Sequence, residues 1–284
     1  MPPTTRSQTK WARCEMSEVS IVTISGPPQG APSIELDPHV AYLLRLADDN
    51  LVLAQRLGEW ISRGPDLEED IALGNIGLDH LGVARNLLTH AGEVEGAGRD
   101  EDELAMKRTE RQYLNLVLCE QPNGDFAQTM ARQLFIDAWQ VPLWEELSES
   151  TNETLAGIAQ KAVKEARYHL RHSATWVVRL GDGTSESHGR MQAAVDRLWR
   201  YTGEAFLGDD VDEEMMARGI GVEPTLLRPR WLETVTGVLE EATLEAPEDD
   251  YIRAGGRLGY HTEHLGHLLA EMQWMQRTYP GATW

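Results

Sequence analysis

The sequence predicts an all-α fold, a long four-helix bundle with additional helices toward the C-terminus. Four segments, each about 26 residues long, carry apolar residues at alternating spacings of three and four, which is the spacing of one helix face. No segment shows a convincing alternation of apolar and polar residues, the pattern of a half-buried strand. A short turn joins the first two segments, and this predicts that they are antiparallel neighbours.

The first long helix is predicted to begin after Asp37, an N-cap residue followed by proline at the first helical position, and to end near Ser62. Its apolar stripe contains one polar residue, Asn50. The other members of the stripe are Leu43, Ala47, Ala54, Leu57 and Ile61. We interpret this stripe as the face that the helix buries in the core.

The second long helix is predicted over residues 67–91, after a turn at residues 63–66. His80 lies on its apolar stripe. Glycines at positions 74, 77 and 82 each destabilise a helix interior by ~1 kcal/mol relative to alanine. We interpret them as places where a neighbouring helix approaches closely, with local flexibility as the alternative.

Two short helices are predicted between residues 92 and 124, the clearer one over residues 109–118. The third long helix follows the cap residue Asp125 and runs to about residue 150. Asp137 lies on its stripe, and Pro142 is expected to kink or unwind it. The fourth long helix is predicted from Asn152 to about residue 180, with His169 on its stripe.

Further helices are predicted over residues 187–207, 209–218, 224–245 and 261–279. Residues 34–284 would then form one helical domain. Residues 1–33 are rich in Pro, Thr, Ser and Gly and have no helical period, so we predict a disordered tail. Met16 offers an alternative start within this tail.

The formal net charge is -20, from 46 acidic and 26 basic residues. Such a charge repels nucleic acid and anionic membranes, so neither is an expected partner, whereas it could attract a basic protein subunit. Cys14 and Cys119 are too few for a disulfide framework or a cysteine metal site. No apolar run approaches the ~18 residues of a membrane span. These features together predict a cytoplasmic protein.

The four predicted stripes each carry one polar residue at a corresponding place: Asn50, His80, Asp137 and His169. These places resemble the ligand positions of a ferritin-like bundle, in which two irons are held by about four carboxylates and two imidazoles. The partner expected three residues after His80 is Val83, and the partner expected three residues before His169 is Ala166. Neither side chain can bind a metal.

We therefore predict a ferritin-like bundle whose metal-site positions are vestigial, with no catalytic residue and no metal in this chain. Asparagine at position 50 is neutral and a poor substitute for an anionic ligand. Asp137 and His169 keep both the residue type and the place. We expect the four polar residues of the stripes to satisfy one another in the core, for instance Asp137 with His169. Glu165 is one residue out of register, and it either joins this polar network or faces solvent.

A second group of candidate ligands lies near the C-terminus, within the segment His261-Thr262-Glu263-His264-Leu265-Gly266-His267. His264, His267 and Glu271 share one helical face. This arrangement is compatible with a mononuclear metal site. The alternative, which we favour, is that these residues line a subunit interface or cap the start of a helix.

Six motifs together carry a resemblance to a known family. They are LVLAQRLGEW at residues 51–60, NIGLDHLG at 75–82, EQPNG at 120–124, FIDAW at 135–139, KEARYH at 164–169 and HTEHLG at 261–266. The chain resembles the structural C subunits of ring 1,2-phenylacetyl-CoA epoxidase, a multicomponent phenylacetyl-CoA monooxygenase. The resemblance covers about residues 39–284 and leaves out the N-terminal tail.

The resemblance implies a non-catalytic scaffold in aerobic phenylacetate degradation. Its implied partners are a catalytic A subunit that carries the di-iron centre, a small B subunit, and a reductase that carries FAD and an iron–sulfur centre. Two alternatives remain open. One is a di-iron oxygenase subunit with its own atypical metal site, and the other is a regulatory module that binds acyl-CoA or a metal through residues 261–267.

Overall fold

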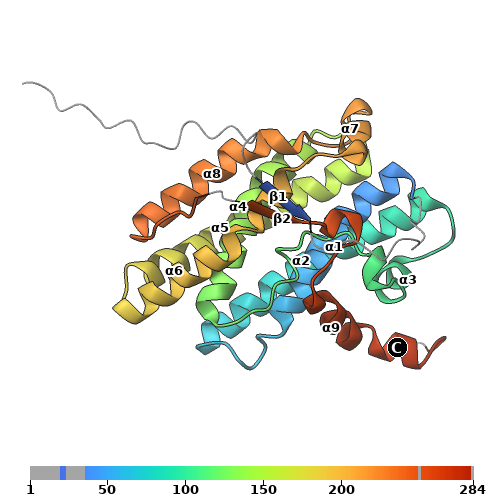
Figure 1. Ribbon diagram of the computed structural model, residues 1–284. Helices are drawn as coiled ribbons and strands as arrows, with labels where there is room; N and C mark the ends of the chain where they lie inside the picture. Colours follow the sequence, from blue (N-terminus) through green and yellow to red (C-terminus); the bar gives the residue numbers. More distant parts are fainter. Residues whose placement is uncertain (1–19, 24–35, 249–250, 283–284) are drawn as a thin grey trace, which may run out of the picture.

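The computed structural model describes residues 20–23, 36–248 and 251–282 and confirms the all-α fold (Figure 1). Four long helices form the bundle: α1 (Pro38–Gly58), α2 (Leu67–Glu95), α4 (Phe126–Leu147) and α5 (Glu153–Gly181). Each begins at a residue whose side chain accepts a hydrogen bond from a backbone N–H of the first turn. These N-caps are Asp37, Asp66, Asp125 and Asn152.

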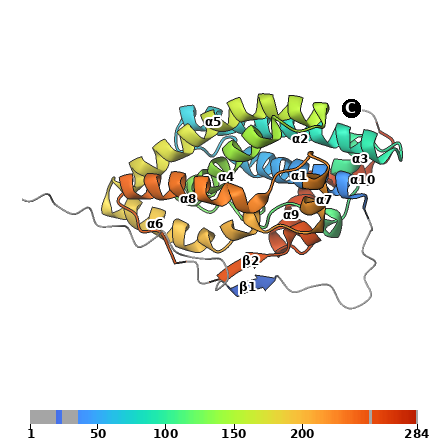
Figure 2. The same ribbon diagram turned by 90° about the horizontal axis from the view of Figure 1, so that it is seen from above.

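The bundle is built from two helix pairs that pack side by side. α1 lies along α2, α4 lies along α5, and α2 also contacts α5 (Figure 2). Side-chain hydrogen bonds link the two pairs across the core: Trp60, just after α1, donates to Thr129 of α4, and Gln140 of α4 donates to Asn50 of α1. These two hydrogen bonds therefore hold α1 against α4 and join the two helix pairs.

The three glycines of α2 have different surroundings. A Cβ atom at Gly77 would lie 3.4 Å from Leu57 Cβ and 3.5 Å from the carbonyl oxygen of Ala54, so α1 does approach closely there. At Gly74 and Gly82 an added Cβ would meet nothing within 4 Å among the described residues. The interpretation of close approach is thus correct for Gly77 and wrong for the other two within this chain.

The segment predicted as a helix over residues 109–118 is mostly not helical. α3 (Glu101–Met106) and the 3-10 turn η2 (Glu110–Gln112) precede an extended stretch. Buried carboxylates of α1 hold this stretch, because Leu114 N–H donates to Asp48 at 2.8 Å and Leu116 N–H donates to Asp49 at 2.7 Å. The carboxylates replace the carbonyl acceptors that a helix would have supplied.

The C-terminal half adds α6 (Ser185–Trp199), η3 (Thr202–Phe206), α7 (Asp210–Ala217), α8 (Pro224–Glu241), η4 (Gly256–Leu258), α9 (Glu263–Met272) and α10 (Trp274–Thr278). α6 and α8 pack on α4 and α5, and α7 packs on α1. The helices predicted over residues 187–207 and 261–279 are each broken in two, into α6 with η3 and α9 with α10.

Two short strands depart from the expectation of a strand-free chain. β1 (Ser20–Thr23) pairs in parallel with β2 (Tyr251–Ala254), with Ser20 opposite Tyr251. Four residues of the predicted disordered tail are thus paired, and the rest of residues 1–33 lies outside the described part of the chain. The pairing joins segments from opposite ends of the sequence, so local periodicity could not reveal it.

Three smaller expectations can be compared with the described helices. α1 ends at Gly58, and Ile61 is exposed instead of lying on the core stripe. α4 runs through Pro142 as one continuous helix, so the local unwinding expected as an alternative to a kink does not occur. Among the described residues, no helix is both long enough and apolar enough to cross a bilayer.

Candidate functional site

Three side chains that can bind a metal meet at the centre of the bundle. His80 comes from α2, Asp137 from α4 and His169 from α5, and they are 2%, 1% and 2% exposed. One ligand atom from each lies within 4.8 Å of the other two. Each residue sits on the apolar stripe of its helix, so packing of the three stripes brings the three side chains together.

The tautomer of His80 follows from its neighbour on α1. Asn50 donates its amide N–H to the Leu46 carbonyl at 2.8 Å, and this contact fixes the orientation of the amide. Asn50 Oδ1 then faces His80 Nδ1 at 2.8 Å. Because a carbonyl oxygen only accepts, His80 carries its proton on Nδ1 and leaves the lone pair of Nε2 free.

The same logic applies to the other two residues. His169 Nε2 donates to the Asp79 carboxylate at 3.1 Å, which leaves the lone pair of Nδ1 free. Ser173 Oγ donates to Asp137 Oδ2 at 2.7 Å. The predicted pairing of Asp137 with His169 is therefore wrong, since each bonds to another residue. The expectation that the polar stripe residues satisfy one another is confirmed for Asn50 and His80.

Each of the three central residues keeps one buried acceptor atom without a hydrogen-bond partner among the described residues: His80 Nε2, Asp137 Oδ1 and His169 Nδ1. Burial lowers the pKa of His80 well below its ordinary value, and the neighbouring His169 lowers it further. Burial also lowers the pKa of His169, against the opposing effect of Asp79. Burial raises the pKa of Asp137 to about 8, although Ser173 and Arg132 oppose the shift.

The residues present do not fit a centre of two irons. Val83 and Ala166, where the sequence analysis expects further di-iron ligands, are both buried and have no donor atom in the side chain. Asn50 uses its amide on Leu46 and His80. Two imidazoles and one carboxylate remain, which is half of the set that a dinuclear carboxylate centre uses.

Glu165, one residue out of register, does not join the three side chains at the centre. It forms a 3.2 Å ion pair with Lys161 one turn earlier on α5. Burial raises its pKa, and the charge of Asp79 contributes to that shift, whereas Lys161 opposes it. Glu165 therefore stands at the edge of the polar region, near Asp79.

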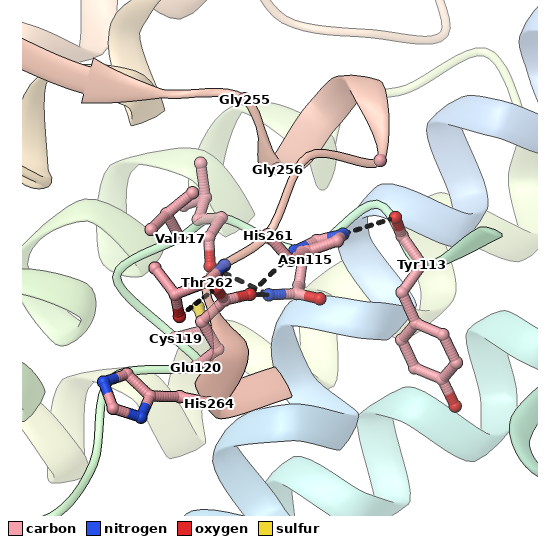
Figure 3. A network of polar contacts seen from close by, with 12 residues as sticks. Tyr113, Asn115, Val117, Cys119, Glu120, Gly255, Gly256, His261, Thr262 and His264 are labelled. Atoms are coloured by element: carbon pink, nitrogen blue, oxygen red, sulfur yellow. Dashed lines mark hydrogen bonds and ion pairs between the residues drawn. The ribbon is translucent and has the colours of Figure 1, made fainter. Parts of the chain in front are cut away.

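The C-terminal histidines form a different arrangement (Figure 3). His261 donates from Nδ1 to Glu120 at 2.7 Å and from Nε2 to the Tyr113 carbonyl at 2.8 Å. Within the described residues, His264, His267 and Glu271 do not form a group of converging ligand atoms. This segment therefore anchors the chain, and Figure 3 shows His264 lying outside its dashed contacts.

Several residues of these two sites were not identified from sequence. Asp79 and Ser173 orient the central cluster, and Glu120 accepts four hydrogen bonds in the C-terminal network. The sequence did contain a hint of both residues: Asp79 directly precedes His80, and Ser173 lies four residues after His169, on the same face of the helix. Glu120 gave none, because its partners are as far as 142 residues away in sequence.

The fold and the central cluster define an all-α bundle protein with a polar centre formed by three of its four long helices. The chain belongs to the phenylacetic acid catabolic protein family, whose model matches residues 24–284. The C subunit of 1,2-phenylacetyl-CoA epoxidase from Escherichia coli (strain K12) is 55% identical over 244 residues, covering 86% of this chain and 98% of that protein. The resemblance indicated by the six motifs is confirmed, and it supports a role in phenylacetate catabolism.

Proposed function

We propose that this chain is a non-catalytic structural subunit of a multicomponent phenylacetyl-CoA epoxidase. It pairs with a ferritin-like, di-iron catalytic subunit in aerobic phenylacetate degradation in the cytoplasm. The observation that carries the proposal is the chemistry at the bundle centre. Asn50, Val83 and Ala166 stand where a di-iron bundle needs ligands, while the four-helix framework around them is complete. On this proposal the bundle keeps its fold through helix packing, although the positions that would hold two irons have lost their ligands.

An exposed apolar face on α2 supports the pairing. Leu67, Ile71, Leu78 and Leu81 are all exposed at spacings of four, seven and three, so they follow one side of the helix. Tyr168 adds an exposed ring on the neighbouring α5. A contiguous apolar face of this kind is typical of a protein–protein contact.

The free glycines of α2 lie within the same stretch as this face. Gly74 and Gly82 leave open space where a side chain would otherwise stand. A partner helix could therefore approach the α2 backbone closely, as α1 does at Gly77. The formal net charge of -20 suits a basic small subunit or a reductase as further components.

Co-expression with the di-iron subunit of the same system tests the proposal. We expect one stable complex on size-exclusion chromatography, with two irons assigned to the partner chain and epoxidation of phenylacetyl-CoA when the small subunit and the FAD and iron–sulfur reductase are added. The separated chain should show no epoxidation. Turnover by this chain alone, or failure to co-elute with the di-iron subunit, would contradict the proposal.

A further inference from the structure

We infer that the centre of the bundle binds one divalent transition-metal ion through His80 Nε2, Asp137 Oδ1 and His169 Nδ1. The ion would be structural, tying α2, α4 and α5 together at the place where a related bundle would hold two irons. This inference concerns the metal chemistry of the isolated chain and does not depend on the proposed subunit role. It also departs from the expectation that the chain binds no metal.

The first argument is that all three free atoms are electron-pair donors. Hydrogen bonds to Asn50, Asp79 and Ser173 use the other polar atom of each residue and leave bare acceptors facing one buried point. Leaving a buried polar group without a hydrogen-bond partner is destabilising. One ligand atom of each residue lies within 4.8 Å of the others, so a shared cation could satisfy the three residues together.

Occupants other than a metal satisfy the set less completely. A protonated Asp137 would donate one hydrogen bond to one of the two histidines. The ring nitrogen of the other histidine would remain without a hydrogen-bond partner. One water molecule has two hydrogens to donate, so it also leaves one of the three acceptors without a partner. A metal ion accepts an electron pair from all three atoms at once.

The donor set selects the class of ion. Two neutral imidazoles with one carboxylate suit zinc or iron(II), whereas magnesium and calcium prefer oxygen ligands. Metal–ligand bonds of ~2.1 Å hold two donors at most ~4.2 Å apart, which is close to the 4.8 Å within which one ligand atom of each residue already lies.

The outer contacts match those of metal-bound histidines. A ligating imidazole commonly donates its second N–H to a carboxylate or a carbonyl oxygen, which fixes its tautomer. His169 does so to Asp79, and His80 does so to Asn50. Gln140 donates to the same Asn50 oxygen at 3.3 Å and holds it in place. Asp79 is 40% exposed and connects the buried cluster to solvent.

The positive charge of a nearby arginine, Arg132, disfavours binding of a cation. Arg132 is fully buried on α4, and its charge is felt at both His80 and Asp137. Its guanidinium donates to the Gln121 carbonyl and to Asn123, so it is directed at the loop before α4. The carboxylates of Asp137 and Asp79 offset a divalent charge from the other side.

The test uses the untagged full chain, stripped of metal by a chelator and then titrated with cobalt(II) or with zinc. We expect one cobalt ion per chain, with visible absorption bands of a nitrogen- and oxygen-ligated site that zinc abolishes by competition. The melting temperature should rise as the zinc concentration increases, because an ion that binds the folded state stabilises it.

Variants locate the ion. Asp137→Asn and His169→Gln should each remove the cobalt bands, and Asn50→Ala should weaken binding about 10–100-fold by releasing the His80 ring. His267→Gln, on an exposed side chain of α9, is the matched control and should bind like the original chain.

Two results would overturn the inference. One is the absence of stoichiometric cobalt or zinc binding by the original chain. The other is unchanged stoichiometry and spectrum in both the Asp137→Asn and the His169→Gln variants. If a variant fails to fold, the Asn50→Ala titration still decides the matter, since unchanged affinity in that variant contradicts the proposed orientation of His80.

Discussion

The Nδ1 atom of His261 donates a 2.7 Å hydrogen bond to the carboxylate of Glu120, across 141 residues of chain. Both side chains are almost fully buried. The same carboxylate accepts from the backbone N–H and the hydroxyl of Thr262 and from Asn115. This pair fastens the segment before α9 to the connection between α3 and α4.

The His261 contact predicts a pH-dependent contribution to stability. Burial alone would lower the pKa of His261, but the hydrogen bond and charge of Glu120 and the Tyr113 carbonyl outweigh it, so the pKa is raised. A raised folded pKa gives stability that is fully present below the unfolded value of ~6.5 and is lost as the pH rises through the folded pKa.

Replacement of His261 tests the predicted direction of this pH dependence. His261→Gln should lower the free energy of unfolding by about 3 kcal/mol at pH 6, because it leaves a buried carboxylate without its charged partner. The difference between the two proteins should shrink toward pH 9. Urea unfolding at several pH values measures it. A difference that grows with pH would contradict the assignment of a charged histidine.

The buried pair of Asp48 and Arg108 makes a second prediction. Arg108 donates to Asp48 with two nitrogen atoms, and both side chains are buried. Arg108→Met should destabilise the fold by about 3–5 kcal/mol, because Asp48 remains buried without its charge partner. The exposed pair of Arg85 and Glu101 is the control, and Arg85→Met should change the unfolding free energy by less than about 1 kcal/mol.

Two glycines should respond in opposite directions to alanine. Gly82 has open space around the missing Cβ, so Gly82→Ala should stabilise the isolated chain by about 0.5–1 kcal/mol through better helix propensity. At Gly256 a Cβ would lie 1.9 Å from the carbonyl oxygen of Asn115. Gly256→Ala should therefore lower the melting temperature clearly. Thermal unfolding of both variants checks the contrast.

The α2 face makes a prediction about assembly. Leu78 is 64% exposed, so Leu78→Asp should leave the helical circular dichroism and the melting temperature of the isolated chain nearly unchanged. The same change should weaken co-elution with the di-iron subunit at least tenfold, because it would bury an unpaired charge in the contact. The control is Leu226→Asp, because the Leu226 side chain of α8 is also exposed and lies outside the α2 face. Equal loss of assembly in both variants would rule out the α2 face as the specific contact.

Much of the fold was predictable from the sequence because helix signals are local. The stripes and the caps at Asp37, Asp125 and Asn152 predicted where the long helices begin. The all-α class is confirmed, and the boundaries of the four long helices differ by at most a few residues. Helix ends were less predictable, because tertiary contacts decide which of the last turns persist.

The sequence predicted which residues lie at the central site, but it did not predict how their side chains are hydrogen-bonded. The stripes named Asn50, His80, Asp137 and His169, since an inward polar residue stands out on an apolar face. The expected bond between Asp137 and His169 was wrong, because Ser173 and Asp79 lie closer to the atoms concerned. Which atom of each side chain is left free depends on partners from other helices.

The sequence by itself determined the helices and the side chains available at the centre, including the absence of donors at Val83 and Ala166. The tertiary structure alone decided three things: the extended path of residues 113–116, the parallel pairing of β1 with β2, and the approach of His80, Asp137 and His169 to one another. The physical reason is that helix formation depends on neighbours within a few residues. Buried polar groups instead take whichever partner the packed helices bring near, however distant it is in the chain.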